Sequence, residues 1–216
     1  MARPRGFGEG GASTPMAIIW PCPVSASSYA AAGQQIAVPP QRCPTCRRAL
    51  VGWGGYWRWL RAPPGEWRLW IRRGRCVACV RTHALLPDLV LVRRLDAVEV
   101  IGPGLALKVI QGLGLRPIAE QFGVPHTTVR SWWRRFRARS PTQLASCLAL
   151  AVQLTGVSVQ LAADGERGAL AALGVAWDRA RARFGEQVGG LWPFWSHISG
   201  GQALGTNTSP PWAGLR

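Results

Sequence analysis

Acidic residues and uninterrupted apolar runs are both scarce in this chain. Only 10 of its 216 residues are aspartate or glutamate, against 26 lysines and arginines, so few carboxylates are available for acid–base or metal chemistry. Lys108 is the only lysine, and arginine therefore carries nearly all of the positive charge. Near the start, the only apolar run is Met16 to Trp20, which is shorter than the core of a signal peptide, about 7 to 15 residues. We therefore expect a cytoplasmic protein rather than a secreted one.

A membrane span is also not expected. The stretch from Ser140 to Ala163 carries no charge over 24 residues. Six polar side chains interrupt it, whereas a spanning helix needs about 20 predominantly apolar residues. The interrupting residues are Gln143, Ser146, Gln153, Thr155, Ser158 and Gln160. The pattern predicts a packed helix here.

The positive charge is concentrated in two blocks. The net charge is +16 and the isoelectric point is about 11.5. Residues 42–94 contain twelve arginines against Glu66 and Asp88, and residues 116–139 contain six arginines against Glu120. A general bias toward arginine would not place the charge in two segments. The distribution favours a polyanionic partner, and a nucleic acid is the first to consider.

Four of the six cysteines form two C-x-x-C pairs. Cys43 and Cys46 make the first pair, and Cys76 and Cys79 make the second, with 29 residues between the pairs. Each C-x-x-C turn presents two sulfurs, so two turns supply the four thiolates of a closed tetrahedral zinc site. The spacing predicts one structural Zn²⁺. A disulfide pair or a redox pair is the alternative, although the first needs an oxidising compartment and the second a strand-to-helix context.

The residues between the cysteine pairs indicate a β-hairpin. Aromatic and apolar residues flank a turn at Pro63-Pro64-Gly65, as in the two strands of a zinc ribbon. Lone Cys22 and Cys147 are expected to be buried thiols. His83 lies four residues beyond Cys79 and could replace a cysteine as ligand, but four sulfurs suffice, so we expect a hydrogen-bonded loop histidine there.

Residues 115–135 have the pattern of a helix-turn-helix. Small Ala119 allows close helix contact, Gly123 lies at the sharp turn, and Pro125 suits the start of a second helix. The apolar positions predicted to face inward are Ile118 and Phe122, then Val129, Trp132 and Phe136. The outward stripe is Thr127, Arg130, Arg134 and Arg137.

A recognition helix contacts base edges with its N-terminal residues and phosphates with later basic residues. The predicted base contacts are His126, Thr127 and Arg130, and the predicted phosphate contacts are Arg134, Arg135 and Arg137. The alternative is an ordinary helical hairpin with a solvated basic face. The preceding helix, 95–111, is expected to be split at Gly102-Pro103-Gly104.

The predicted fold class is α+β and mostly helical, with a small four-cysteine zinc ribbon (β-hairpins) followed by a helix-turn-helix domain and C-terminal helices. Apolar residues with helical spacing continue through 144–155 and 170–184, after Ser140-Pro141. The glycine- and proline-rich end is expected to be loose, with Trp212 as an anchor. The expected divisions are a disordered or extended segment 1–40, the ribbon 41–92, the helix-turn-helix domain 93–140, C-terminal helices 141–190 and a tail 191–216. Met16 is an alternative start to Met1.

The motifs RRGRCVACVRTHALLPD and GLRPIAEQFGVPHTTVRSWWRRF, which follow the first C-x-x-C, support a resemblance. Together with WPCP at 20–23 and TNTSPPW at 206–212, they resemble a bacterial family of uncharacterised proteins that pair a zinc-binding domain with a helix-turn-helix. Residues 40–140 also resemble the N-terminal DNA-binding region of insertion-sequence transposases. The resemblance implies that the four paired cysteines hold zinc and that residues 127–137 read DNA.

The combined expectation is a non-enzymatic, nucleoid-associated protein that binds double-stranded DNA, either a regulator or a transposase-related protein. A homodimer or a transposase or polymerase partner is compatible with it. A complete transposase would need a nuclease fold with clustered carboxylates, and only four carboxylates follow position 139. The alternative function is a protein–protein interaction module, or a truncated or split transposase subunit.

Overall fold

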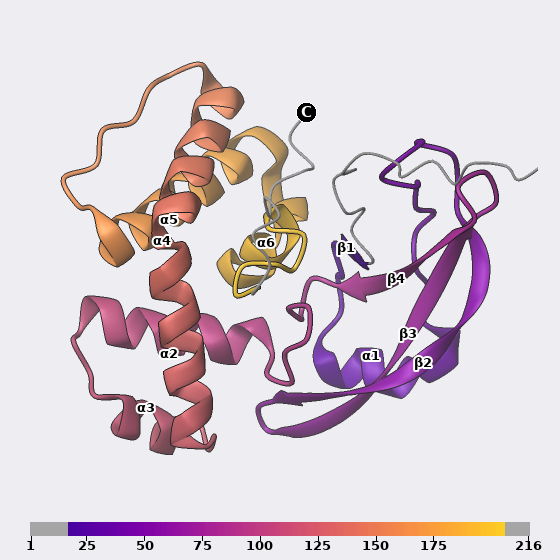
Figure 1. Ribbon diagram of the computed structural model, residues 1–216, viewed down its shortest axis with the longest axis horizontal. Helices are drawn as coiled ribbons and strands as arrows, with labels where there is room; N and C mark the ends of the chain where they lie inside the picture. Colours follow the sequence, from indigo (N-terminus) through magenta and orange to yellow (C-terminus); the bar gives the residue numbers. More distant parts are fainter. Residues whose placement is uncertain (1–16, 206–216) are drawn as a thin grey trace, which may run out of the picture.

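The chain folds into two lobes, one built on a β-sheet and one made of helices (Figure 1). A computed structural model describes residues 17–205. The fold is α+β, with 49% helix and one four-stranded sheet, which confirms the predicted class. Among residues 17–205, no helix combines the length and the apolar character that crossing a membrane requires.

The sheet has the strand order β1-β4-β3-β2. Strands β2 (Val51–Ala62) and β3 (Gly65–Cys76) form a long antiparallel hairpin, which confirms the strands predicted on either side of the Pro63-Pro64-Gly65 turn. Strand β4 (Arg81–Pro87) pairs antiparallel with β3, and the short β1 (Ala17–Trp20) runs parallel to β4. Tryptophan and tyrosine, which suit a pleated and partly buried surface, recur along β2 and β3.

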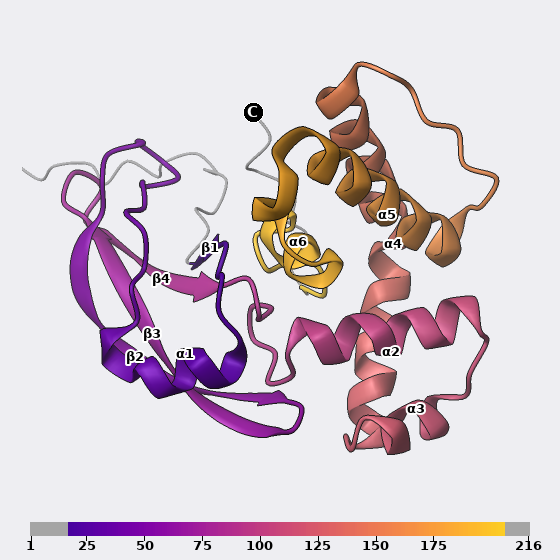
Figure 2. The ribbon, with the colours of Figure 1, turned by 180° about the vertical axis from the view of Figure 1, so that it is seen from behind.

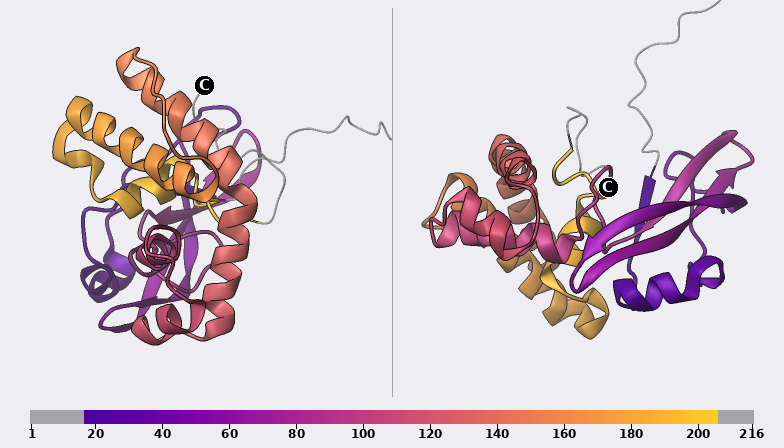
Figure 3. Two further views of the ribbon diagram at one scale, coloured as in Figure 1. Left: turned by 90° about the vertical axis from the view of Figure 1, so that its left-hand side faces the viewer. Right: turned by 90° about the horizontal axis from the view of Figure 1, so that it is seen from below.

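The segment 1–40 was expected to be disordered or extended; β1 is extended, but residues 26–35 are helical, so for them the expectation is wrong. Beyond β1, a helix α1 (Ala26–Ala32) continues into a 3-10 turn, η1 (Gly33–Gln35), and packs against β3 (Figure 3). Two aromatic side chains explain the order: Trp20 and Tyr29 are almost fully buried, and the Tyr29 hydroxyl donates a hydrogen bond of 3.0 Å to the carbonyl of Trp70. Residues 1–16 lie outside the described part of the chain.

The helical lobe is built around two long helices that pack against each other (Figures 1 and 2). Helix α4 is crossed by α2 and contacts α3 near its start, while α6 lies between the lobes. The stripes predicted over 144–155 and 170–184 fall on α4 and α5, as expected. The helices are α2 (Val98–Ile110), α3 (Leu115–Gln121), α4 (His126–Thr155), α5 (Gly165–Phe184) and α6 (Leu191–Ile198), with a 3-10 turn η2 at Gly185–Val188.

Helix α2 is continuous, so the predicted split at Gly102-Pro103-Gly104 is wrong. Proline removes one backbone hydrogen bond from a helix interior. Here close packing on both sides of the proline offsets that loss. A Cβ at Gly102 would lie 2.0 Å from a ring atom of Trp192, and a Cβ at Gly104 would lie 3.4 Å from the ring of Trp132. The two glycines therefore serve as contact points for neighbouring helices rather than as helix breakers.

Helix α4 also passes through a proline, Pro141, the first residue of the expected segment of C-terminal helices. Pro141 has no N–H to donate to the carbonyl of Arg137, one turn earlier. The hydroxyl of Ser140 donates to that carbonyl instead, at 2.9 Å. The expected division at 140/141 consequently falls inside one helix of 30 residues.

The predicted loose tail, 191–216, is ordered as far as residue 205. Helix α6 buries Trp195, whose indole N–H donates to Gln143 on α4 at 2.8 Å, and the Ser196 hydroxyl donates to the carbonyl of Val90 at 2.6 Å. These contacts hold residues 191–205 against both lobes. The glycine- and proline-rich composition of the chain end did not predict them. Trp212 lies outside the described residues.

The Gly102 contact predicts a stability effect. Gly102→Ala should lower the free energy of unfolding by about 1–2 kcal/mol, because the overlap with Trp192 outweighs the better helix propensity of alanine. Gly174→Ala in α5, where a Cβ meets nothing within 4 Å, should instead raise the free energy of unfolding. Urea denaturation of both variants measures the difference. Equal effects of the two substitutions would contradict the packing role of Gly102.

Candidate metal centre and basic surfaces

The two C-x-x-C turns adopt similar backbone conformations. Cys43 and Cys46 lie just before β2, Cys76 ends β3, and Cys79 lies in the turn between β3 and β4. The residue after each pair has a positive φ, 63° at Arg47 and 54° at Val80. This left-handed conformation closes each turn tightly, and the N–H of Cys79 lies 3.4 Å from the sulfur of Cys76. Each turn therefore directs its two sulfurs toward the other turn.

The four predicted cysteines meet in one cluster. All four sulfurs lie within 4.8 Å of one another, with 3.9 Å between Cys43 and Cys79 and 3.4 Å between Cys46 and Cys76. Four thiolates around an ion with bonds of about 2.3 Å are about 3.8 Å apart in a tetrahedron. The spacing fits such an ion. Since four sulfurs fill every tetrahedral position, the arrangement is that of a closed structural site.

Hydrogen bonds spread the pKa values of the clustered thiols. Burial raises the pKa of Cys43, but N–H groups of Cys46 and Thr45 directed at its sulfur help to lower the pKa overall, to about 6. A hydrogen bond with Cys46, followed by burial, raises the pKa of Cys79 to about 12. A bound divalent cation would favour the thiolate form of all four, so metal binding releases protons.

His83 is a neighbour of the cluster and not one of its four ligand candidates. It lies on β4, not in the loop that the sequence predicted, and is almost fully buried. Its Nε2 is 3.9 Å from the Cys43 sulfur, within reach of a weak N–H···S contact, so the expected hydrogen-bonded histidine is confirmed. Cys147 is buried as predicted, and Cys22 is half-buried.

Helices α3 and α4 present a polar face opposite a buried one. Ile118, Val129, Trp132 and Phe136 are buried, as their spacing predicted. Gly123, in the turn that joins the helices, has a φ of 62°, a conformation that glycine adopts without strain. The predicted outward stripe is exposed at all four positions: Thr127, Arg130, Arg134 and Arg137.

The arginines of α4 differ in what they contact. Arg137 forms an ion pair with Glu166 of α5, with 3.3 Å between Nε and Oε1, and Arg135 donates to the Ser131 hydroxyl at 3.3 Å. Within residues 17–205, Arg130 and Arg134 have no carboxylate partner. Half-buried His126 is the first residue of α4. The two unpaired arginines are thus the side chains best placed to bind an external anion.

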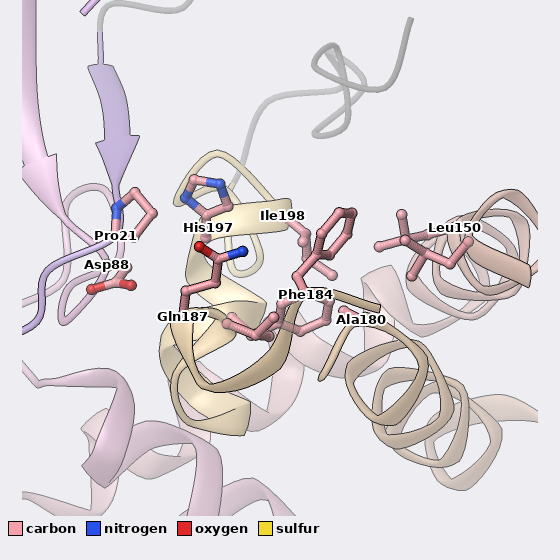
Figure 4. A pocket seen from close by; sticks show the side chains of 11 residues that line it. Pro21, Asp88, Leu150, Ala180, Phe184, Gln187, His197 and Ile198 are labelled. Carbon is pink, nitrogen blue, oxygen red and sulfur yellow. The ribbon is translucent and has the colours of Figure 1, made fainter. Parts of the chain in front are cut away.

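A cavity of about 280 Å³ lies where α4, α5 and α6 meet the end of β4 (Figure 4). Apolar side chains of the three helices form most of its wall, and Asp88, Gln187 and His197 form a polar end. Burial is the main cause that raises the pKa of Asp88 to about 7, and burial lowers the pKa of His197. Sequence analysis missed these residues because they come from distant segments that share no motif.

A family model described as a domain of unknown function, DUF6431, matches residues 43–132. The matched region begins at the first cysteine of the cluster, continues through β2, β3, β4, α2 and α3, and ends at Trp132 in α4. It covers less than half of the chain. No curated protein and no solved structure gave a significant match.

The cysteine cluster predicts metal binding with a defined stoichiometry. The full chain should bind about one equivalent of Co²⁺ with the absorption of a tetrahedral thiolate complex, and Cys46→Ala should abolish that absorption. Cys22→Ala removes a thiol outside the cluster and should leave the stoichiometry unchanged. Chelation should also lower the melting temperature, because metal binding contributes to folding. An unaltered spectrum in Cys46→Ala would show that the four sulfurs do not act together.

Buried Asp88 predicts a pH-dependent stability. The pKa of Asp88 in the folded chain, about 7, lies above the ordinary 3.8. The contribution of the protonated carboxyl to the free energy of unfolding is therefore fully present below pH 3.8 and is lost as the pH rises through about 7. Asp88→Asn should remove this loss and stabilise the protein more at pH 8 than at pH 5. Asp178→Asn changes an exposed carboxylate and should have the same small effect at both values. Urea denaturation at the two pH values tests the difference, and a pH-independent effect of Asp88→Asn would contradict it.

Proposed function

We propose that this chain is a zinc-containing, helix-turn-helix DNA-binding protein with no catalytic domain of its own. The observation that carries the proposal is the two-sided α4. One side, through Val129, Trp132 and Phe136, is fixed in the core, while the other presents Thr127, Arg130 and Arg134 to solvent. A recognition helix needs both properties, because its position must be rigid while its polar face enters the major groove.

The chemistry of the exposed face suits a duplex. His126, Thr127 and Arg130 lie in the first turns of α4, where a recognition helix contacts base edges, and a guanidinium matches the acceptor pair of guanine. Arg134 and Arg135 follow one turn later, at the distance along the helix where phosphates lie. Arg137 is held by Glu166, so a phosphate contact would compete with that ion pair.

The cysteine cluster would bind zinc as a structural ion. Four thiolates leave no position for water, so the ion would stabilise the fold and not activate a nucleophile. It would close the base of the β2–β3 hairpin, as in a zinc ribbon. Zinc is favoured over an iron–sulfur cluster because the sulfurs lie about as far apart as the four ligands of a single ion.

The biological setting that we propose is regulation of a promoter or a function related to DNA transposition, in the cytoplasm and at the nucleoid. A nuclease domain that follows the helix pair is not supported, since residues 141–205 form helices and contain no strand. Of the four carboxylates in that stretch, Glu166 pairs with Arg137 and Glu186 pairs with Arg181. A homodimer or a transposase subunit would be a compatible partner.

The test is selection of bound sequences from a random duplex library by the zinc-loaded chain at near-physiological salt. We expect an enriched motif. Arg130→Ala should relax the preference at one position, with about a tenfold loss of discrimination. Arg134→Ala should weaken binding to all sequences and reduce the salt dependence by about one ion.

Arg73→Ala removes the same charge from the β lobe and serves as the matched control. If Arg130→Ala and Arg134→Ala both bind the duplex as the parent chain does, α4 is not the recognition helix. A folded, zinc-loaded chain without any enriched motif would contradict sequence-specific recognition.

A further inference from the structure

The β2–β3 hairpin exposes large aromatic side chains that the core does not use. Trp57 is 39% exposed and Trp59 is 56% exposed, on the strand that also carries the buried Leu60. Trp59 is thus more exposed than any other large apolar side chain of this hairpin. Indole rings in water are unfavourable, so such exposure commonly marks a binding surface.

The strand register places an arginine among these rings. Trp59 is directly opposite Arg68, and Trp57 is directly opposite Trp70, so all four side chains lie on one face of the hairpin. The Arg68 guanidinium lies 5.0 Å from the ring centre of Trp57. Trp57 and Trp70 make an edge-to-face contact with 5.1 Å between ring centres. We call Trp57, Trp59 and Arg68 the hairpin platform.

The platform is supported at one side by the segment that follows α1. Arg72 of β3 donates hydrogen bonds to the carbonyls of Ile36, at 3.0 Å, and Gln34, at 2.9 Å. A Cβ on Gly33 would lie 3.7 Å from the Trp57 ring, so this segment also supports that indole. The Trp57 part of the platform is therefore preformed, which reduces the entropy lost on binding.

The platform carries the positive charge of Arg68, which forms no ion pair within the described residues. Glu66 is the only acidic residue on the two strands. Arg72, two residues beyond Trp70 on β3, adds a second positive charge on the same face. An anionic ligand with flat, apolar faces is complementary to such a surface, whereas a basic or purely aliphatic one is not.

We propose that the hairpin platform binds single-stranded nucleic acid by stacking unpaired bases on Trp59 and Trp57, while Arg68 contacts the backbone. A duplex hides the faces of its bases, so exposed indoles gain stacking energy only from unpaired nucleotides. The turn of the hairpin lies along the same edge of the molecule as the start of α4 (Figures 1 and 2). The proposal goes beyond duplex binding by α4 and stands without it.

The experiment measures affinity of the full chain for a labelled oligothymidine of about 16 nucleotides, at several salt concentrations. Trp59→Ala should weaken binding about tenfold, and Trp59→Phe, which keeps an aromatic face, should restore most of the loss. Arg68→Ala should weaken binding and reduce the salt slope by about 0.7, the value for one phosphate contact on a single strand.

Arg73→Ala is the matched control, because Arg73 is on the same strand, is also exposed and faces the other side of the sheet. Arg73→Ala should weaken oligothymidine binding less than Arg68→Ala does. It should also leave unchanged the loss of affinity that Trp59→Ala causes. Arg134→Ala should reduce duplex binding alone, so failure of the α4 proposal and failure of this one are distinguishable. Circular dichroism checks that each variant is folded.

Two results would overturn the proposal. The first is oligothymidine binding by Trp59→Ala that equals that of the parent chain. The second is that the parent chain sediments as a dimer and Trp59→Ala as a monomer, while both bind oligothymidine equally. A second copy of the chain would then occupy the platform. Tenfold weaker binding in Trp59→Ala with recovery in Trp59→Phe supports it.

Discussion

Both lobes depend on the buried contacts of residues 191–205. Trp195 and Ser196 connect α4 to the loop that leaves the sheet, through the hydrogen bonds to Gln143 and Val90. Gly201 adds a close approach, since a Cβ there would lie 2.8 Å from Ile19 and 2.9 Å from Val92. These contacts fix the direction of α4 relative to the hairpin, and so fix how the two proposed nucleic-acid surfaces are oriented relative to each other.

The hairpin is fixed at both ends. At one end the cysteine cluster joins the start of β2 to the turn after β3. Near the other end, the Arg61 side chain forms an ion pair with buried Asp96 at 2.8 Å. The backbone N–H of Arg61 donates to the carbonyl of Leu95 at 2.7 Å. Strands of 12 residues, about 40 Å long, would otherwise twist freely in water. The cysteine cluster and the loop that contains Leu95 and Asp96 thus hold the two ends of the hairpin on either side of the aromatic face.

Local patterns in the sequence predicted the local parts of this structure. Each C-x-x-C pair, the Pro63-Pro64-Gly65 turn and the inward face of α4 are patterns among residues that lie close together in the sequence. The errors concern proline and chain ends, where side-chain hydrogen bonds and packing contacts decide the outcome and the local pattern does not show them. Ser140 compensates for Pro141, and Trp192 packs on Gly102 from 90 positions away. The DNA contacts stay a prediction: the structure shows that Thr127, Arg130 and Arg134 are exposed, and exposure alone does not identify what they bind.

The continuity of α4 has a mechanical consequence. At about 1.5 Å per residue, its 30 residues form a rod of about 45 Å. The distal half lies against α5 and α6 near the cavity that contains Asp88, while the proximal half carries Arg130 and Arg134. The proximal half is held in turn by α2 and α3, so α4 is supported near both of its ends. One continuous helix therefore fixes the spacing between the cavity and the arginine face.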